Sequence, residues 1–461
     1  MTSIRFRARS AVLAGAAGLG AMLLGACNPK EELLSPQQPG VISPGDVQSA
    51  TGAEGLYSGA VGNFMRALDA GSGNQETIWQ FSGLFADEYK TADTFSQRND
   101  ADQRVTQTND GLLGPLYNTL QQSRGSARTA LTYLKQFEPT SSSTHQAEMY
   151  FIIAFDELQL AEDFCNGIPL GETIDGVPQY SKPYTTKDVY TMAAARADSG
   201  LALLGSASDA ASAQIRNALL VTKGRIQTDL GQFAAAATTV ASVPLSFQYA
   251  ALFSNTTTDN GNWQITTNSR RYSVGDSVDP TGVVKNALPF VSAKDPRVPT
   301  TLSGNKTGSD GTTPLYIPTG FNRDDPVAIV DGLDAQLIQA EAKLNASDIA
   351  GMMTILNALR AAPPTQGVFK PSGTLAPLAT PATKDAATTL FFREKAFWTF
   401  GRGQRLGDLR RQVRLYGRTQ DQVYPTGPFF KQGSYGTKMF FPVPDVEKSN
   451  PNFTGCLDLN P

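Results

Sequence analysis

The feature that most constrains this fold is a helical period in the apolar residues, which recurs along most of the chain. In 327–345, Leu333, Leu337, Ala340 and Leu344 follow one another at spacings of four, three and four residues. This spacing places all four on one helix face and predicts a buried stripe. By the same criterion we expect helices over 46–70, 111–137, 143–164, 186–204, 208–229, 232–242, 327–345, 348–361 and 384–404. So many amphipathic helices favour a helical solenoid over a parallel sheet.

Two of the expected helix pairs resemble the tetratricopeptide repeat. In 217–243, Gly224, Gly231, Phe233 and Ala236 stand where that repeat has its small residues and its aromatic residue. Small residues let two antiparallel helices approach closely, and the aromatic ring fills the groove between them. Residues 335–361 resemble a second, degenerate copy. The predicted fold class is therefore mainly α, a tetratricopeptide-like helical solenoid packed against a loop-rich, irregular half.

Two long irregular regions, 71–110 and 244–326, interrupt the helices, and long loops in compact proteins are commonly functional. Both carry aromatic, amide and arginine side chains. A sugar stacks its apolar face on aromatic rings and bonds its hydroxyls to polar side chains, so these regions suit sugar binding. The candidate ligand-binding residues are Trp79, Tyr89, Arg98, Asn99, Trp263 and Tyr272. For the two tryptophans, the alternative is that each anchors its loop to the core. A third region, 362–383, is expected to be a surface connection.

The N-terminus has the parts of an export signal. Arg5, Arg7 and Arg9 precede an uncharged run over 11–26, which ends in Leu-Leu-Gly-Ala before Cys27. This ending resembles a bacterial lipobox, which predicts lipidation of Cys27. The alternative is an ordinary cleaved signal with a chance cysteine. The predicted segments are a lipoprotein signal peptide at 1–26, a lipidated tether at 27–45 and one domain at 46–461.

Two further cysteines, Cys165 and Cys456, remain when Cys27 is set aside. An even number of cysteines in an exported, oxidising setting predicts a disulfide between them. The alternative is two buried free thiols.

Composition argues against several classes of function. The formal net charge is −3, which disfavours a nucleic-acid binder with a basic face. With one histidine (His145) and three cysteines, no metal site and no histidine-based catalysis is expected. Acidic pairs such as Asp87–Glu88 and Asp324–Asp325 lie in no recognisable active-site motif, and hydrolysis of glycans needs two carboxylates at a defined separation. We therefore expect no enzyme activity and no cofactor.

The C-terminal third carries an ordered set of short motifs. They are, in chain order, Asp295-Pro296-Arg297-Val298, Ala340-Glu341-Ala342 with Asn357 and Arg360, Arg393-Glu394-Lys395, Gly403-Gln404-Arg405-Leu406-Gly407-Asp408-Leu409-Arg410-Arg411, Phe440-Phe441-Pro442-Val443-Pro444-Asp445 and Asn450-Pro451-Asn452-Phe453. In these motifs the chain resembles the SusD/RagB family of nutrient-binding outer-membrane lipoproteins. The chain departs from the pattern at Gly401-Arg402, where the family has a carboxylate before the Gly-Gln-Arg.

We interpret Glu394, Arg405, Asp408 and Arg410 as structural. Arg405 and Asp408 are three residues apart on a helix, close enough to pair. Arg410 and Arg411 can bond carboxylates or orphan carbonyl groups. The proline-spaced ending is expected to lie pinned along the body.

The resemblance implies a lipid-anchored protein at the surface of the outer membrane that binds a nutrient, most often an oligosaccharide. It would deliver this ligand to a TonB-dependent, SusC-like transporter. The alternative is a periplasm-facing scaffold lipoprotein that uses helical repeats to bind proteins.

Overall fold

The computed structural model describes residues 48–71, 75–174, 177–254, 256–364, 371 and 375–460. The predicted signal peptide, Cys27, the tether and much of the predicted 362–383 connection lie outside the described residues. Residues Ser49–Pro461 form one unit, whose described part is mainly helical.

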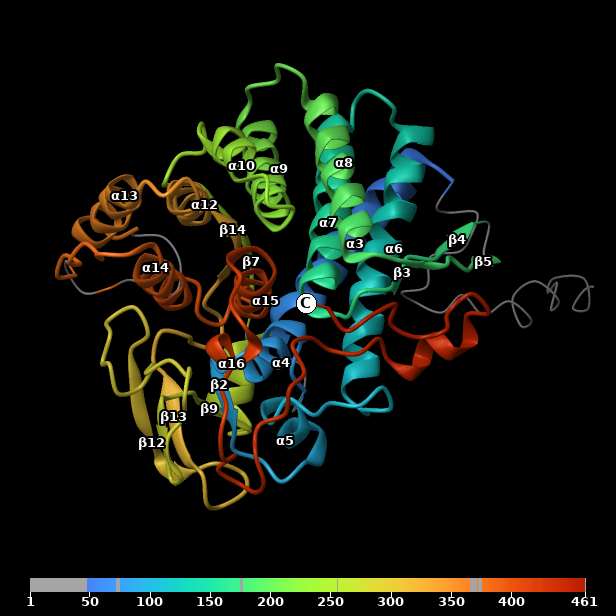
Figure 1. Ribbon diagram of the computed structural model, residues 1–461. Coiled ribbons are helices and arrows are strands. Elements are labelled where there is room, and N and C mark those ends of the chain that lie inside the picture. The colour runs from blue at the N-terminus through green and yellow to red at the C-terminus, as the bar shows by residue number, and fades with distance from the viewer. Residues whose placement is uncertain are drawn as a thin grey trace, which may run out of the picture. The chain divides into compact units, whose positions relative to one another are not determined.

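Helices follow one another through most of this unit (Figure 1). They are α3 (Ala50–Asp69), α4 (Ile78–Phe85), α5 (Ser96–Asp102), α6 (Leu113–Phe137), α7 (Ser143–Asp163), α8 (Thr186–Leu204), α9 (Ala210–Asp229), α10 (Phe233–Val240), α11 (Gly261–Trp263), α12 (Gly332–Asn345), α13 (Ile349–Ala361), α14 (Lys384–Trp398), α15 (Arg405–Tyr416) and α16 (Gln420–Val423). A π-helical turn, η1 (Gln264–Asn268), follows α11, and a 3-10 turn, η2 (Asp445–Ser449), lies near the end of the chain.

The described strands are short and pair only in antiparallel twos. The pairs are β1 (Ala70–Gly71) with β8 (Asp259–Asn260), β2 (Tyr89–Thr91) with β9 (Tyr272–Val274), β3 (Ile168–Pro169) with β6 (Pro183–Tyr184), β4 (Glu172–Ile174) with β5 (Val177–Gln179), β7 (Gln248–Ala251) with β14 (Val327–Asp331), β10 (Val278–Asp279) with β11 (Gly282–Val283), and β12 (Thr300–Thr307) with β13 (Pro314–Pro318).

The long helices pack in succession, as a solenoid requires. Helix α3 contacts α6, which is followed in turn by α7, α8, α9, α10, α12 and α13 (Figure 1). Side-chain caps fix several of the starts. The Thr185 hydroxyl accepts from the Asp188 amide at the start of α8, and the Asp209 carboxylate accepts from the Ser212 amide at the start of α9. The predicted mainly α, tetratricopeptide-like fold is confirmed.

The tetratricopeptide-like pair α9–α10 shows why its small residues are needed. A Cβ on Gly224 would lie 2.4 Å from Val240 Cγ1 of α10 and 3.2 Å from Ile338 Cδ1 of α12. Ala236 is fully buried on the facing side of α10. The absent side chain at Gly224 therefore lets three helices meet at one point.

The first five residues of the helix expected over 327–345 instead form the strand β14. Val327, Ala328, Ile329 and Val330 are all buried, and β14 pairs with β7. A continuous apolar run fits a strand covered on both sides as well as a helix, and periodicity alone does not separate the two. The true helix start is marked by Asp331, whose carboxylate caps α12.

The region 71–110 is far less irregular than predicted. It contains α4, β2 and α5, and every residue of α4 is buried. Helices of seven or eight residues give too few turns for a period to show. The region 244–326 likewise carries β7 to β13 among its loops.

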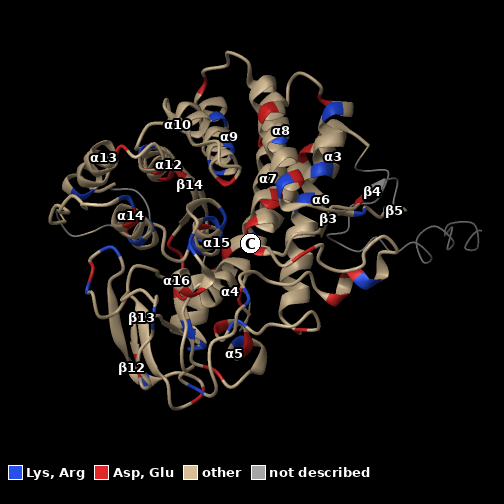
Figure 2. Ribbon diagram, in the orientation of Figure 1, with Lys and Arg blue, Asp and Glu red and all other residues tan. Residues whose placement is uncertain are grey.

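Helix α15 carries the Arg-Leu-Gly-Asp-Leu-Arg-Arg sequence through the interior, where Figure 2 shows basic and acidic segments side by side around it. Arg405 does not pair with Asp408 as predicted. Its Nε donates to the Ala86 carbonyl at 2.8 Å. Asp408 accepts instead from Lys395 Nζ at 2.6 Å and from Arg411, which is three residues further along the helix. Asp408 therefore pairs with the arginine three residues after it in the sequence, and not with Arg405, three residues before it.

Arg410 satisfies the end of α7, as the orphan-carbonyl interpretation predicts. Its Nη1 donates to the carbonyls of Ala161, Glu162 and Phe164 at 2.8, 2.6 and 2.8 Å. The last carbonyls of a helix have no partner within the helix. A single buried guanidinium therefore closes α7 against α15.

The other motif residues also meet in space although they are far apart in sequence. Glu394, fully buried on α14, accepts from Arg297 Nη1 at 2.7 Å and from Arg360 Nη1 at 2.9 Å. Glu341 of α12 accepts from Arg411 Nε at 2.7 Å. The charged residues of these motifs thus form ion pairs that join segments far apart in sequence, which agrees with their structural interpretation.

Arg402 stands where the chain departs from the family pattern, and its partners are two aspartates and a backbone carbonyl. Its Nη2 donates to Asp334 at 2.7 Å, its Nη1 lies 3.3 Å from Asp331, and its Nε donates to the Ala328 carbonyl at 2.9 Å. The cation therefore joins the α14–α15 turn to the start of α12.

The C-terminal segment is pinned along the body. The Phe441 amide donates to the Asp163 carbonyl at 2.8 Å, and the Cys165 amide donates to the Phe441 carbonyl at 2.9 Å. The predicted disulfide between Cys165 and Cys456 is present. It closes a loop of 291 residues, which restricts the unfolded chain.

Replacement of Arg410 tests the closure of α7. Arg410→Met leaves three buried carbonyls without a donor, so we expect the free energy of unfolding in urea to fall by about 3–5 kcal/mol. Arg216→Met is the matched control, because Arg216 also bonds two carbonyls, those of Gly205 and Ala207, but does so at the surface. We expect the control to cost less than about 1 kcal/mol. Equal losses would contradict the assignment.

Glu88 gives a pH-dependent stability. Burial raises the pKa of its carboxyl from about 4.5 to about 8, although the positive charge of Arg405 opposes this. A raised carboxyl pKa favours the protonated folded state, so its stabilisation is present below pH 4.5 and is lost as the pH rises through 8. Between pH 5 and pH 8.5, urea unfolding of the wild type should lose about 3 kcal/mol more than that of Glu88→Gln. Identical pH profiles would exclude a raised pKa at Glu88.

Candidate functional site

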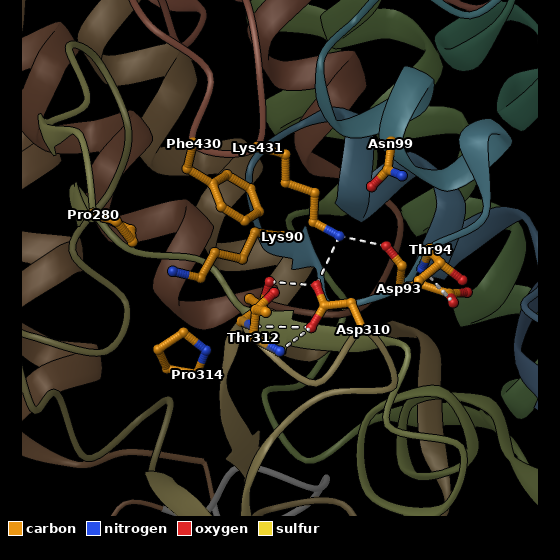
Figure 3. A pocket seen from close by; sticks show the side chains of 11 residues that line it. Lys90, Asp93, Thr94, Asn99, Pro280, Asp310, Thr312, Pro314, Phe430 and Lys431 are labelled. Atoms are coloured by element: carbon orange, nitrogen blue, oxygen red, sulfur yellow. Dashed lines mark hydrogen bonds and ion pairs between the residues drawn. The ribbon is translucent and has the colours of Figure 1, made fainter.

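A surface pocket of about 540 Å³ lies where β2, α5 and the turns of two hairpins meet the 430–431 segment (Figure 3). Its volume is in the range of about 300–1,000 Å³ that small-ligand sites occupy. Residues from both predicted ligand regions contribute to it. The lining residues are Lys90, Asp93, Thr94, Asn99, Pro280, Asp310, Thr312, Thr313, Pro314, Phe430 and Lys431.

Asp93 is a fixed point of the pocket wall. It is fully buried and accepts from Arg98 and from Arg271 Nη1, the latter at 2.7 Å. Burial works to raise the pKa of Asp93, but the hydrogen bonds from the two arginines outweigh it and hold the pKa below its ordinary value. Arg98 is itself held by Glu76, at 2.9 Å from Nε to Oε1. The carboxylate thus remains ionised and locked in place.

The turn between β12 and β13 forms the opposite wall and is closed by Asp310. Asp310 accepts from the amides of Thr312 and Thr313 at 2.9 and 2.8 Å, and from the Thr313 hydroxyl at 2.6 Å. Lys431 Nζ lies 2.8 Å from Asp310 and also donates to the Asp93 carbonyl (Figure 3). Lys431 therefore bridges the two walls.

Two aromatic rings stand at or beside this pocket. Phe430 lines it, with its ring edge-to-face against Phe429 at 4.9 Å between centroids. Phe95, next in the chain to Thr94, is 49% exposed, and the guanidinium groups of Arg98 and Arg271 each lie 5.1 Å from its ring centroid. Two cations packed against this exposed ring favour one orientation of it.

The segment carrying Phe430 is held by side chains from the first predicted ligand region. Arg104 is fully buried and donates to the Pro425 carbonyl at 2.6 Å and to the Lys438 carbonyl at 2.8 Å. Gln103 Nε2 donates to the carbonyls of Gln432 and Ser434 at 3.1 and 2.8 Å. Both ends of the segment are thus anchored, although the segment itself is loop.

Among the predicted site residues, Asn99 lines the pocket, and its buried Oδ1 meets no hydrogen-bond donor of the described residues. Arg98 lies directly behind the wall, 2% exposed, where it positions Asp93. Asn99 therefore contributes to the pocket lining itself, whereas Arg98 acts through another residue.

Three predicted residues are corrected to core positions. Trp79 is fully buried: its Nε1 donates to Gln159 at 3.1 Å, and its indole packs on Gly403, where a Cβ would lie 2.1 Å from Trp79 Cδ1. Tyr89 donates to Asn262 at 2.6 Å, and Tyr272 donates to Glu76 at 3.0 Å, both also fully buried. None of the three offers a ring face to a ligand.

Trp263 is only half-buried but lies apart from the pocket lining. It ends α11, and the Arg323 guanidinium lies over its ring, 5.6 Å from the centroid. Arg323 is held in turn by Asp259 at 2.6 Å. The Trp263 ring packs partly against the core, outside the pocket lining.

Sequence reasoning missed Phe430 and Lys431. They lie in Pro-Thr-Gly-Pro-Phe-Phe-Lys-Gln-Gly, a segment as rich in proline, glycine and aromatic residues as any loop of the chain. The criterion used for 71–110 and 244–326 would have identified it. Its position after the family-like helix drew attention to packing instead.

Within the described ranges, no cluster of three or more His, Cys, Asp or Glu side chains is arranged to hold a metal ion. The same part of the chain contains no helix both long and apolar enough to cross a bilayer.

Comparison of the structure with solved structures reveals a common fold. A SusD-like carbohydrate binding protein from Bacteroides vulgatus superposes with a TM-score of 0.62 at 13% identity, covering 88% of this chain and 97% of its own. A laminarin binding SusD-like protein gives a TM-score of 0.60 at 15% identity, covering 89% and 99%. A SusD superfamily protein from Bacteroides vulgatus gives 0.58 at 14% identity, covering 89% and 99%.

At the level of sequence, no family model matches the chain, and no curated protein matches it either.

Removal of the Asp310 carboxylate should loosen one wall of the pocket. In Asp310→Ala, the amides of Thr312 and Thr313 lose their acceptor, so we expect their hydrogen exchange to accelerate at least about tenfold. Asp279→Ala is the matched control, because Asp279 accepts from the Thr281 amide in the neighbouring β10–β11 turn. The control should leave exchange at 312–313 unchanged. Unaltered exchange in Asp310→Ala would show that the turn does not depend on this carboxylate.

Proposed function

Because the chain has the SusD fold, we propose that it is a binding protein for an oligosaccharide, with the pocket between β2, α5 and the β12–β13 turn as its binding site. The observation that carries this proposal is the composition of the pocket. It combines the aromatic face of Phe430 with the polar side chains of Asn99, Thr94 and Thr312. Sugars need this combination, since their C–H faces stack on rings and their hydroxyls need donors and acceptors.

The rigidity of the pocket walls supports binding. Arg98, Arg271 and Lys431 fix Asp93 and Asp310, so the site is formed before a ligand arrives. A preformed site avoids the cost of ordering side chains on binding. The proposal includes no bond cleavage: the pocket carboxylates are committed to ion pairs, and both have a pKa below the ordinary value because hydrogen bonds from Arg and Lys side chains outweigh burial. Neither is suited to act as a general acid.

We further propose that the protein is anchored through Cys27 at the outer membrane, faces the cell surface and passes its ligand to a TonB-dependent, SusC-like transporter. The lipobox-like ending before Cys27 supports the anchor. The SusD fold supports the transporter partner only through the function that the family resemblance implies.

Binding can be tested on a glycan panel that includes laminarin oligosaccharides, followed by calorimetry on each hit. Phe430→Ala removes the stacking face and Asn99→Ala removes the amide, so we expect each variant to bind at least about tenfold more weakly.

Tyr180→Ala is the control. Tyr180 is an exposed aromatic, at 49%, but it lies beside the C-terminal segment rather than in the pocket, and its replacement should leave binding unchanged. Binding that survives both pocket substitutions would move the site elsewhere. Binding of no glycan at all would refute the proposed function.

A further inference from the structure

Lys90 enters the pocket from β2, and its ammonium forms no direct ion pair with another described side chain. Its Nζ lies 5.5 Å from the Phe430 ring centroid, and no hydrogen bond or ion pair joins it to a described residue. We infer that the pocket takes an anionic sugar, whose carboxylate or sulfate group pairs with Lys90 while its ring stacks on Phe430. This inference rests on the proposed function and narrows its ligand class.

The acidic groups that line the pocket are already committed elsewhere. Asp310 pairs with Lys431, and Asp93 pairs with Arg98 and Arg271. Lining and supporting side chains together therefore carry more cationic than anionic charge. An incoming anion restores the balance, whereas a neutral ligand leaves the Lys90 ammonium without a counter-charge.

Two buried acids of the surrounding elements, Asp87 and Asp102, lie within the field of the Lys90 charge, but their hydrogen bonds go to backbone amides and not to its amine. Asp87 Oδ2 accepts from the Leu288 amide at 3.0 Å, and Asp102 Oδ2 accepts from the Thr91 amide at 2.6 Å. Burial raises the pKa of Asp87 to about 7 and raises that of Asp102 well above its ordinary value. Burial thus opposes the anionic form of both groups, and neither carboxylate bonds the Lys90 amine directly.

The surroundings of the Lys90 amine favour a ligand over a structural role. Figure 3 shows the amine reaching to the side of the pocket where Pro280 and Pro314 lie, away from Lys431 and its carboxylate. Proline side chains offer no acceptor. A cation beside a ring gains less than one that bonds an anion, so the contact with Phe430 leaves most of the binding capacity of the amine unused.

The test compares sugars that differ only in charge. Calorimetry on the full-length chain would use trimeric galacturonate against its methyl ester, and a sulfated galactan oligosaccharide against its desulfated form. The proteins would be the wild type, Lys90→Met, Lys90→Arg and Lys187→Met. Lys187, an exposed lysine of α8, serves as the matched control.

We expect at least one acidic sugar to bind the wild type about tenfold more tightly than its neutral partner. Lys90→Met should abolish that preference, while Lys90→Arg and Lys187→Met should keep it. The preferred pair identifies the anion as carboxylate or sulfate. Equal binding of charged and neutral sugars, or a preference that survives Lys90→Met, would overturn the inference and leave oligosaccharide binding intact. Binding of none of these four sugars would overturn the inference, and the proposed function would fall only if no glycan of the wider panel bound either.

Discussion

The fold depends on guanidinium groups buried among backbone and carboxylate oxygens around α15. Burial of a charge is costly unless its partners replace the lost water, and loss of one partner then leaves an uncompensated charge. Arg410 meets three carbonyls of the α7 terminus, and Arg411 meets Glu341 of α12 and Asp229 of α9. Each arginine therefore specifies the position of a different helix. The apolar stripes bring the helices together, and the bonds of these arginines fix the positions of the helices relative to one another.

This arrangement explains why the family-like motifs lie so far apart in sequence. Asp295, Arg297, Arg360 and Glu394 form one cluster, so a change at any of them would remove a partner from a buried charge. Arg402 shows that the partners in such a buried ion pair can change. In this chain a cation stands where the family pattern has a carboxylate, and the aspartates at the start of α12 have become its partners. Complementary charge, rather than one particular residue, is what the position requires.

How far the sequence predicts this structure follows from the same physics. Long amphipathic helices are predicted by the periodicity of their apolar residues, and Gly224 indicates a close approach of helices. Short elements do not: α4 has only eight residues, all buried, and β14 is an apolar run compatible with either structure. For the pocket, both predicted regions contribute lining residues, but the residue types mislead. Trp79 is a candidate because of its ring, yet large rings most often fill cores, and only Asn99 of the six candidates lines the pocket.

Buried arginines hold the pocket walls at the surface in the same way as they hold the helices in the core. The residues that stabilise the pocket are therefore different from those proposed to select its ligand. Arg98 and Arg104 are buried and hold loop segments through carboxylates and carbonyls, as Arg410 holds α7. Lys90 and Phe430 also line the cavity but take no part in those networks. Under the proposed function, substitution at these two positions would alter what the pocket binds without stranding a buried charge. A fold built in this way can keep its arginine framework while its ligand changes, and for that reason ligand contacts leave no fixed motif in the sequence.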